Sequence, residues 1–179
     1  MRREDCAFQN TDPNEWGSHP GSSTPVSPIL ALVGFVGLCL LVGGAAGTMI
    51  AGMPHAWYLA LTRPPGTPSS WLLGITWLSL YSLVGVAGWL AWRSATITRP
   101  LRLWGWQLAA SACWVPAFFA LHSPPLALAI SAVLLILIGL TVRAFAALQP
   151  MAAWLMAPYL AWTAFATYLI AGFWWLNPT

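Results

Sequence analysis

Residues 126–148 have the sequence LALAISAVLLILIGLTVRAFAAL, and this stretch decides the fold class. Its one charged residue is Arg143, close to the C-terminal end. A helix needs about 20 apolar residues to cross a hydrocarbon core roughly 30 Å thick. Because a lipid interior gives backbone groups no water, a run of this length and composition has to be helical there. The stretch therefore predicts a transmembrane helix.

Four more apolar segments of similar length accompany it. The predicted transmembrane helices are 29–52, 71–92, 103–121, 126–148 and 151–174. Proline and arginine occupy the connections, where helices are expected to end. The last two connections are so short that helices three to five have to be antiparallel neighbours. We predict an all-α membrane protein in which residues 29–179 form a single bundle of five transmembrane helices.

The first 28 residues differ sharply from this domain. They are polar, and they contain every acidic residue of the chain: Glu4, Asp5, Asp12 and Glu15. Such a segment cannot bury enough apolar surface to offset the conformational entropy of ordering it. We therefore predict that residues 1–28 form a disordered tail.

The composition excludes several classes of function. Hydrophobic residues make up 59% of the chain and charged residues 6%, whereas soluble domains carry about a quarter charged residues. Since no carboxylate follows Glu15, the membrane region lacks the acids of proton-coupled transporters, paired-carboxylate hydrolases and carboxylate-ligated metal sites. Cys6, Cys39 and Cys113 are too dispersed for zinc or a disulfide framework. We predict no metal site and no nucleic-acid partner, because the few arginines lie between apolar runs.

The arginines also predict the orientation in the membrane. Arg93, Arg99 and Arg102 flank the second loop, and Arg143 can extend to the same side of the bilayer. Only Arg63 lies on the opposite side. The positive-inside rule then places the N-terminus in the cytoplasm.

In the first segment, Gly43 and Gly47 form a pair of small residues four apart. Such a pair lets helix backbones approach closely. The sequence leaves open whether this contact is within the bundle or between two copies of the chain.

The chain contains 13 tryptophans, and most lie near the ends of the apolar segments. An indole ring at headgroup depth keeps its N–H hydrated. We assign to this interfacial belt Trp71, Trp89, Trp92, Trp104, Trp106, Trp154, Trp174 and Trp175.

Three tryptophans, Trp77, Trp114 and Trp162, lie well inside segments. A mid-membrane indole N–H lacks water and needs an acceptor from a neighbour or from a ligand. One interpretation is core packing, with the N–H bonded to a protein oxygen. The other is a flat aromatic cavity between helices, suited to a planar apolar ligand.

Three motifs on three segments resemble those of a known family. The first contains Trp57-Tyr58, Arg63-Pro64, Trp77 and Tyr81, and the second contains Gln107-Leu108, Trp114, Pro116 and Phe118-Phe119. The third is Pro158-Tyr159, Trp162 and Phe165-Ala166. In order and spacing they are similar to the tryptophan-rich sensory protein family (translocator protein, peripheral-type benzodiazepine receptor), and the chain resembles its bacterial members over residues 29–179.

The resemblance implies a five-helix bundle, often a homodimer, that binds protoporphyrin IX, haem-like tetrapyrroles and other planar hydrophobic molecules. It implies no obligatory cofactor, and it makes loop 53–70 the lid of the ligand pocket. The ligand-binding residues carried over are Trp57, Tyr58, Arg63, Trp77, Tyr81, Ser111, Trp114, Phe118, Trp162 and Ala166.

The resemblance also suggests a candidate enzymatic activity. Some bacterial members degrade protoporphyrin in light, which makes Trp77 and Trp162 the candidate catalytic residues. An indole can donate an electron or a proton to an excited porphyrin. Our expectation leans towards a binding protein in which such turnover is weak and secondary.

This chain departs from the family pattern at several positions. Ser111 and Ile170 stand where the family usually has asparagine, so we expect a less polar pocket. Gly66 replaces an aromatic residue and Ser69 a proline in the loop, so we expect a looser lid. No basic residue follows Arg143, which removes the proposed sterol-recognition pattern.

The roles of Arg63 and of two loop histidines remain open. Arg63 either pairs with lipid phosphate or holds a porphyrin propionate in a bidentate pair. His55 and His122 lie in loops on the same side and are candidate ligands of haem iron.

The expected function is therefore an integral membrane receptor or sensor that binds tetrapyrroles. The alternative is a passive transporter or exporter of the same molecules, because the missing acids argue against proton coupling only. A third reading is a regulatory partner that changes its protein contacts when liganded.

Overall fold

The computed structural model describes residues 27–52, 56–94 and 99–178. Most of the predicted tail, and His55, lie outside these residues. The helices are α1 (Pro28–Gly52), α2 (Ala56–Ala60), α3 (Ser70–Ser94), α4 (Arg99–Val115), the π-helix η1 (Pro116–Ala120), α5 (Pro124–Leu148) and α6 (Pro150–Leu176). Within the described residues there is no strand, so the predicted all-α fold class is confirmed for them.

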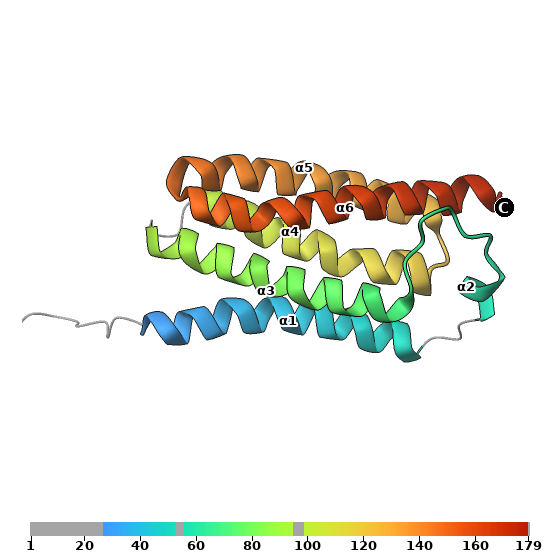
Figure 1. Ribbon diagram of the computed structural model, residues 1–179, viewed down its shortest axis with the longest axis horizontal. Helices are drawn as coiled ribbons and strands as arrows, with labels where there is room; N and C mark the ends of the chain where they lie inside the picture. The colour runs from blue at the N-terminus through green and yellow to red at the C-terminus, as the bar shows by residue number, and fades with distance from the viewer. Residues whose placement is uncertain (1–26, 53–55, 95–98, 179) are drawn as a thin grey trace, which may run out of the picture.

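Four of these helices, α1, α3, α5 and α6, are long and apolar enough to cross a membrane. Helix α4, at 17 residues, is shorter. The long helices lie side by side in an elongated bundle (Figure 1). Large apolar side chains cover its outside, where Trp154 is 75% exposed and Ile29 73%. Lipid is the solvent that such a surface requires.

Prolines begin the last two long helices. Pro124 and Pro125 open α5, and Pro150 opens α6. Proline costs little in a first turn because the N–H that it lacks would have no partner there. Since the connections before α5 and α6 are short, α5 runs antiparallel to both α4 and α6 (Figure 1).

Glycines on α3 bring α1 and α4 close to it. A Cβ added at Gly85 would lie 2.6 Å from the Val36 Cα of α1, and one at Gly88 would lie 2.7 Å from the Trp104 ring of α4. On α1, a Cβ at Gly43 would lie 2.6 Å from the Tyr81 ring. Gly43 therefore makes a contact within the bundle, whereas Gly47 has open space around it.

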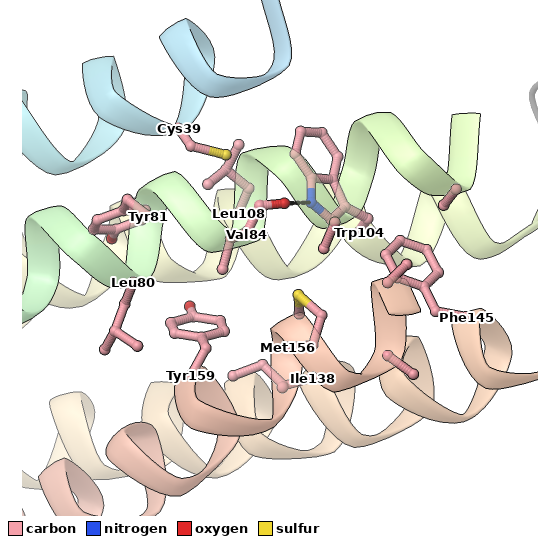
Figure 2. Close-up of a cluster of buried hydrophobic side chains, with 14 of the residues drawn as sticks. Cys39, Leu80, Tyr81, Val84, Trp104, Leu108, Ile138, Phe145, Met156 and Tyr159 are labelled. Carbon is pink, nitrogen blue, oxygen red and sulfur yellow. Dashed lines mark hydrogen bonds between the residues drawn. The ribbon is translucent and has the colours of Figure 1, made fainter. Parts of the chain in front are cut away.

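The assignment of Trp104 to the interfacial belt is wrong. This side chain is only 5% exposed, and its Nε1 donates to the Val84 carbonyl at 3.0 Å (Figure 2). Its ring packs on Phe35 at a centroid distance of 5.2 Å. The missing side chain of Gly88 makes room for the indole, so its place depends on a glycine of another helix.

Candidate functional site

Trp77 of α3 and Trp162 of α6 lie together in the middle of the bundle. Their ring centroids are 6.5 Å apart, and the planes are nearly perpendicular at 85°. Tyr81 lies 5.8 Å from Trp77, and Tyr159 lies 6.4 Å from it. Each helix contributes two rings because residues three or four apart share a face. We call Trp77, Tyr81, Tyr159 and Trp162 the central ring cluster.

Between the two tryptophans there is no flat slot of the kind that one of the two interpretations of the mid-membrane tryptophans implies. Their edge-to-face contact leaves the rings touching, because a T-shaped pair places the edge of one ring on the face of the other. Both side chains are half-buried and pack against the bundle core. A planar ligand would therefore have to part these rings or stack on their free faces.

The central ring cluster has a polar border formed by α4. The Tyr81 hydroxyl and the Ser111 hydroxyl lie 2.7 Å apart and share a hydrogen bond. The family asparagine is thus replaced by a hydroxyl that is already engaged with Tyr81. Figure 2 shows the two tyrosines on facing helices, with Tyr81 on α3 and Tyr159 on α6.

Two buried polar side chains near this border have no hydrogen-bond partner among the described residues. They are Trp162, through Nε1, and Gln107, through both Nε2 and Oε1. An unpaired buried donor or acceptor costs about 1–3 kcal/mol, and lipid offers no water to replace the bond. Sequence reasoning gave Gln107 no role beyond the family motif.

The other predicted ligand-binding aromatic residues form a separate group at the end of the bundle. Trp57 packs on Phe118 at 5.5 Å, and Trp114 stacks on Phe118 at 5.7 Å. Tyr58 lies 5.8 Å from Phe173. We call Trp57, Tyr58, Trp114, Phe118 and Phe173 the loop-end ring cluster. The predicted site residues are therefore divided between two clusters.

Trp114 fits the core-packing interpretation. Its Nε1 donates to the Ser131 hydroxyl of α5 at 2.8 Å, and that hydroxyl donates to the Ala127 carbonyl at 2.9 Å. Its indole is thus satisfied within the protein, in contrast to that of Trp162.

The π-helical turn after α4 carries Phe118 into the loop-end ring cluster. Pro116 lacks a backbone N–H and crowds the preceding turn, and a π-turn is one way in which a helix accommodates such a break. The Leu121 N–H donates to the Pro116 carbonyl, five residues earlier, at 3.0 Å. Phe118 ends 1% exposed.

The remaining predicted residues lie at the borders of the two clusters. The Arg63 guanidinium lies over the Tyr58 ring, 5.4 Å from its centroid, in the loop between α2 and α3. His122 packs beside Trp57 at 4.5 Å. Ala166 is half-buried on α6, one turn after Trp162.

Asn177 fastens the α2–α3 loop to the end of α6, a contact that sequence reasoning missed. The Thr62 N–H donates to Asn177 Oδ1 at 2.8 Å, and Asn177 Nδ2 donates to the Thr62 carbonyl at 3.1 Å. Nδ2 also donates to the Phe173 carbonyl at 2.9 Å. A Cβ at Gly172 would lie 2.7 Å from Pro64, so the loop crosses α6 closely there.

Gly66 has a structural reason to replace the aromatic residue of the family. Its φ is +84°, in the left-handed region that glycine adopts without strain. The loop turns sharply at this point, and a residue with a Cβ would oppose that turn.

We expect Asn177→Ala to loosen the loop over 61–69, because it removes both hydrogen bonds to Thr62. Amide hydrogen exchange of that segment should rise about tenfold if the lost bonds contribute about 1–1.5 kcal/mol to its closure. Asn177→Asp keeps the acceptor for the Thr62 N–H, but it places a charged oxygen against the Thr62 and Phe173 carbonyls that Nδ2 now serves, so exchange should rise in this variant as well. Equal exchange in all three proteins would show that the contact does not hold the loop.

The structure also has a hollow of about 220 Å³ on the outer face between α4 and α5. Its lining is apolar and consists of Ala110, Cys113, Ala129, Ile130 and Val133. None of the predicted site residues lines it.

The comparisons with known proteins agree with the motifs. The model of the TspO/MBR family matches residues 35–176. The tryptophan-rich protein TspO of Chlorobaculum tepidum is 36% identical over 157 residues, which cover 84% of this chain and 98% of that protein. The translocator protein of Ovis aries is 37% identical over 157 residues, covering 82% of this chain and 90% of its own. The tryptophan-rich sensory protein of Cereibacter sphaeroides is 32% identical, covering 71% and 80%.

Proposed function

Since the chain belongs to the TspO/MBR family and is an integral membrane protein, we propose that it binds a tetrapyrrole such as protoporphyrin IX or haem, as a receptor or sensor. The observation that supports this most directly is the central ring cluster, in which the Trp162 N–H has no partner among the described residues. Aromatic faces with few fixed polar groups are what a planar hydrophobic ligand needs.

The chemistry of the cluster favours a large flat ligand over a small one. Its four rings come from two helices, α3 and α6, which a ligand would have to bridge. Offset stacking on several rings gives a macrocycle more contact than a single ring would obtain. The Trp162 N–H, which lacks a partner in the part of the chain that the structure describes, would add one directional hydrogen bond to the ligand. The loop held by Asn177 would close the other end of such a site.

The same proposal includes a fifth transmembrane span. Helices α4 and η1 follow one another without a break over 99–120, which at about 1.5 Å per residue is long enough to cross roughly 30 Å of hydrocarbon. With five spans, the positive-inside rule applied to Arg93, Arg99, Arg102 and Arg143 favours a cytoplasmic N-terminus. Reporter fusions at the two termini should then report opposite sides of the membrane.

Titration of the purified chain in lipid nanodiscs with protoporphyrin tests the binding proposal. We expect saturable quenching of tryptophan fluorescence, and a rise in the melting temperature with ligand concentration, because a ligand of the folded state stabilises it by mass action. Empty nanodiscs provide the control for partition into lipid. Quenching that never saturates, or that leaves the melting temperature unchanged, would contradict specific binding.

Transport is the second candidate, and the name of the Ovis aries and Homo sapiens relatives, translocator protein, favours it. The described helices hold no buried carboxylate, so movement would be passive. Porphyrin entry into sealed proteoliposomes, compared with protein-free liposomes, separates transport from binding alone.

A further inference from the structure

Gln107 is the most deeply buried polar side chain without a partner in the described part of the bundle. It is 1% exposed, and neither its Nε2 donor nor its Oε1 acceptor has a hydrogen-bond partner there. It lies about 12 Å along α4 from Arg99, which places it at hydrocarbon depth. A carboxamide at this depth needs a partner that offers both an acceptor and a donor.

Its position connects it to the central ring cluster. Gln107 and Ser111 are one turn apart on the same face of α4, and Ser111 bonds to the Tyr81 hydroxyl. Towards the N-terminus of α4, Trp104 is already engaged with Val84. The unpaired amide therefore lies on the polar border of the cluster, next to hydroxyls that are occupied.

The side chains around Gln107 determine whether a charged or an uncharged carboxylic acid could approach its amide. The buried polar side chains described in the bundle are Gln107, Ser111, Ser131, Thr141 and Thr163, all of them uncharged. An ionised carboxylate placed among them would have no cation to compensate its lost hydration. An uncharged carboxylic acid presents an O–H beside a C=O, and these two groups complement the C=O and N–H of a primary amide.

We propose that Gln107 is the specificity-determining residue of the site and that it pairs with an uncharged carboxylic acid on the edge of the bound tetrapyrrole. This inference rests on the proposed function. The propionic side chains of the porphyrin supply that group. The acid is then recognised inside the bundle, through hydrogen bonds to the Gln107 amide. Arg63, whose guanidinium lies over Tyr58 in the loop, would instead attract the ionised form.

Three porphyrins with the same ring separate these two modes of recognition. They are protoporphyrin IX, its bis(carboxamide) and its dimethyl ester. The acid and the amide each offer a donor beside an acceptor, the ester offers only an acceptor, and only the acid can ionise. Dissociation constants are measured from porphyrin fluorescence in nanodiscs, for the wild-type chain, Gln107→Met and Cys113→Ala. Cys113 is exposed on the same helix, which makes it the matched control.

In the wild-type chain we expect the amide to bind about tenfold more tightly than the ester, the factor of one neutral hydrogen bond. The acid has to take up a proton from solvent to bind uncharged, so its affinity should match that of the amide only at or below the pKa of a free carboxylic acid, roughly 4–5, and should fall about tenfold for each pH unit above it. Gln107→Met should bring the amide to the affinity of the ester at every pH, while Cys113→Ala keeps the preference for the amide. Without ligand, Gln107→Met should melt at or above the wild-type temperature, because it removes an unpaired amide and keeps the length of the side chain.

Each other result overturns the proposal. Equal binding of the ester and the amide to the wild-type chain would show that the site does not recognise a hydrogen-bond donor. Tight binding of the acid alone would assign recognition to charge. A large fall in the melting temperature of unliganded Gln107→Met would show that the amide has a structural partner. Failure of all three porphyrins to bind would refute the proposed function itself, which the wild-type titration reveals before any variant is made.

Discussion

Gly85→Ala is expected to destabilise the bundle more than the addition of a methyl group at any open glycine. The new Cβ would lie 2.6 Å from the Val36 Cα, 3.0 Å from the Val36 N and 3.1 Å from the Phe35 carbonyl oxygen. These are backbone atoms of α1, so no side-chain rotation can relieve the overlap. Helix α1 has to move away from α3, and overpacking of this kind costs about 1–3 kcal/mol. Thermal unfolding in detergent should show a clear decrease in melting temperature.

Gly74→Ala on the same helix is the control for this experiment. A Cβ at Gly74 meets nothing within 4 Å, and alanine is favoured over glycine in a helix by about 1 kcal/mol. The two variants should therefore shift the melting temperature in opposite directions. If Gly85→Ala has the same melting temperature as Gly74→Ala, α1 and α3 do not pack as closely as the structure shows.

Hydropathy alone located the long helices, because a continuous apolar run of about 20 residues satisfies its own backbone groups in lipid as a helix. Prolines marked their ends for an equally local reason. The contact between Gly85 and Val36 could not be predicted in this way. It depends on which helices become neighbours, and an apolar pattern without polar faces carries little information about neighbours. The wrong assignment of Trp104 has the same origin, since Gly88 of α3 creates its site.

The candidate site shows the same division between local and long-range information. The spacing of Trp77 with Tyr81, and of Tyr159 with Trp162, put two rings on one face of each helix. That these two faces meet is a tertiary fact, as is the bond from Trp114 to Ser131 that satisfies one mid-membrane indole. The role of Asn177 could not be predicted, because its side chain bonds to backbone atoms of Thr62 in a distant loop. Any residue type could supply those backbone atoms, so no sequence signal marks them.

The double substitution Trp77→Phe/Trp162→Phe is expected to lower the affinity for protoporphyrin about 100-fold. Each change shrinks a ring in the central cluster, where an aromatic contact contributes about 0.5–1.5 kcal/mol beyond its area. The change at position 162 also removes the N–H that has no partner in the described residues, which costs about one further hydrogen bond. A total of roughly 2–3 kcal/mol corresponds to this loss. Porphyrin fluorescence, rather than tryptophan quenching, should report it, since the number of tryptophans changes.

The matched control replaces two exposed tryptophans of α6, as Trp154→Phe/Trp175→Phe. These side chains are 75% and 83% exposed, so their loss removes the same chemical groups from the lipid-facing surface and should leave porphyrin affinity within about twofold. Illumination of both complexes gives a second measurement. If Trp77 and Trp162 donate to the excited porphyrin, its absorbance should decay more slowly in their double variant than in the control. Unchanged affinity in Trp77→Phe/Trp162→Phe would place the porphyrin elsewhere, and the loop-end ring cluster would become the next site to test, because it holds the remaining aromatic residues carried over from the family.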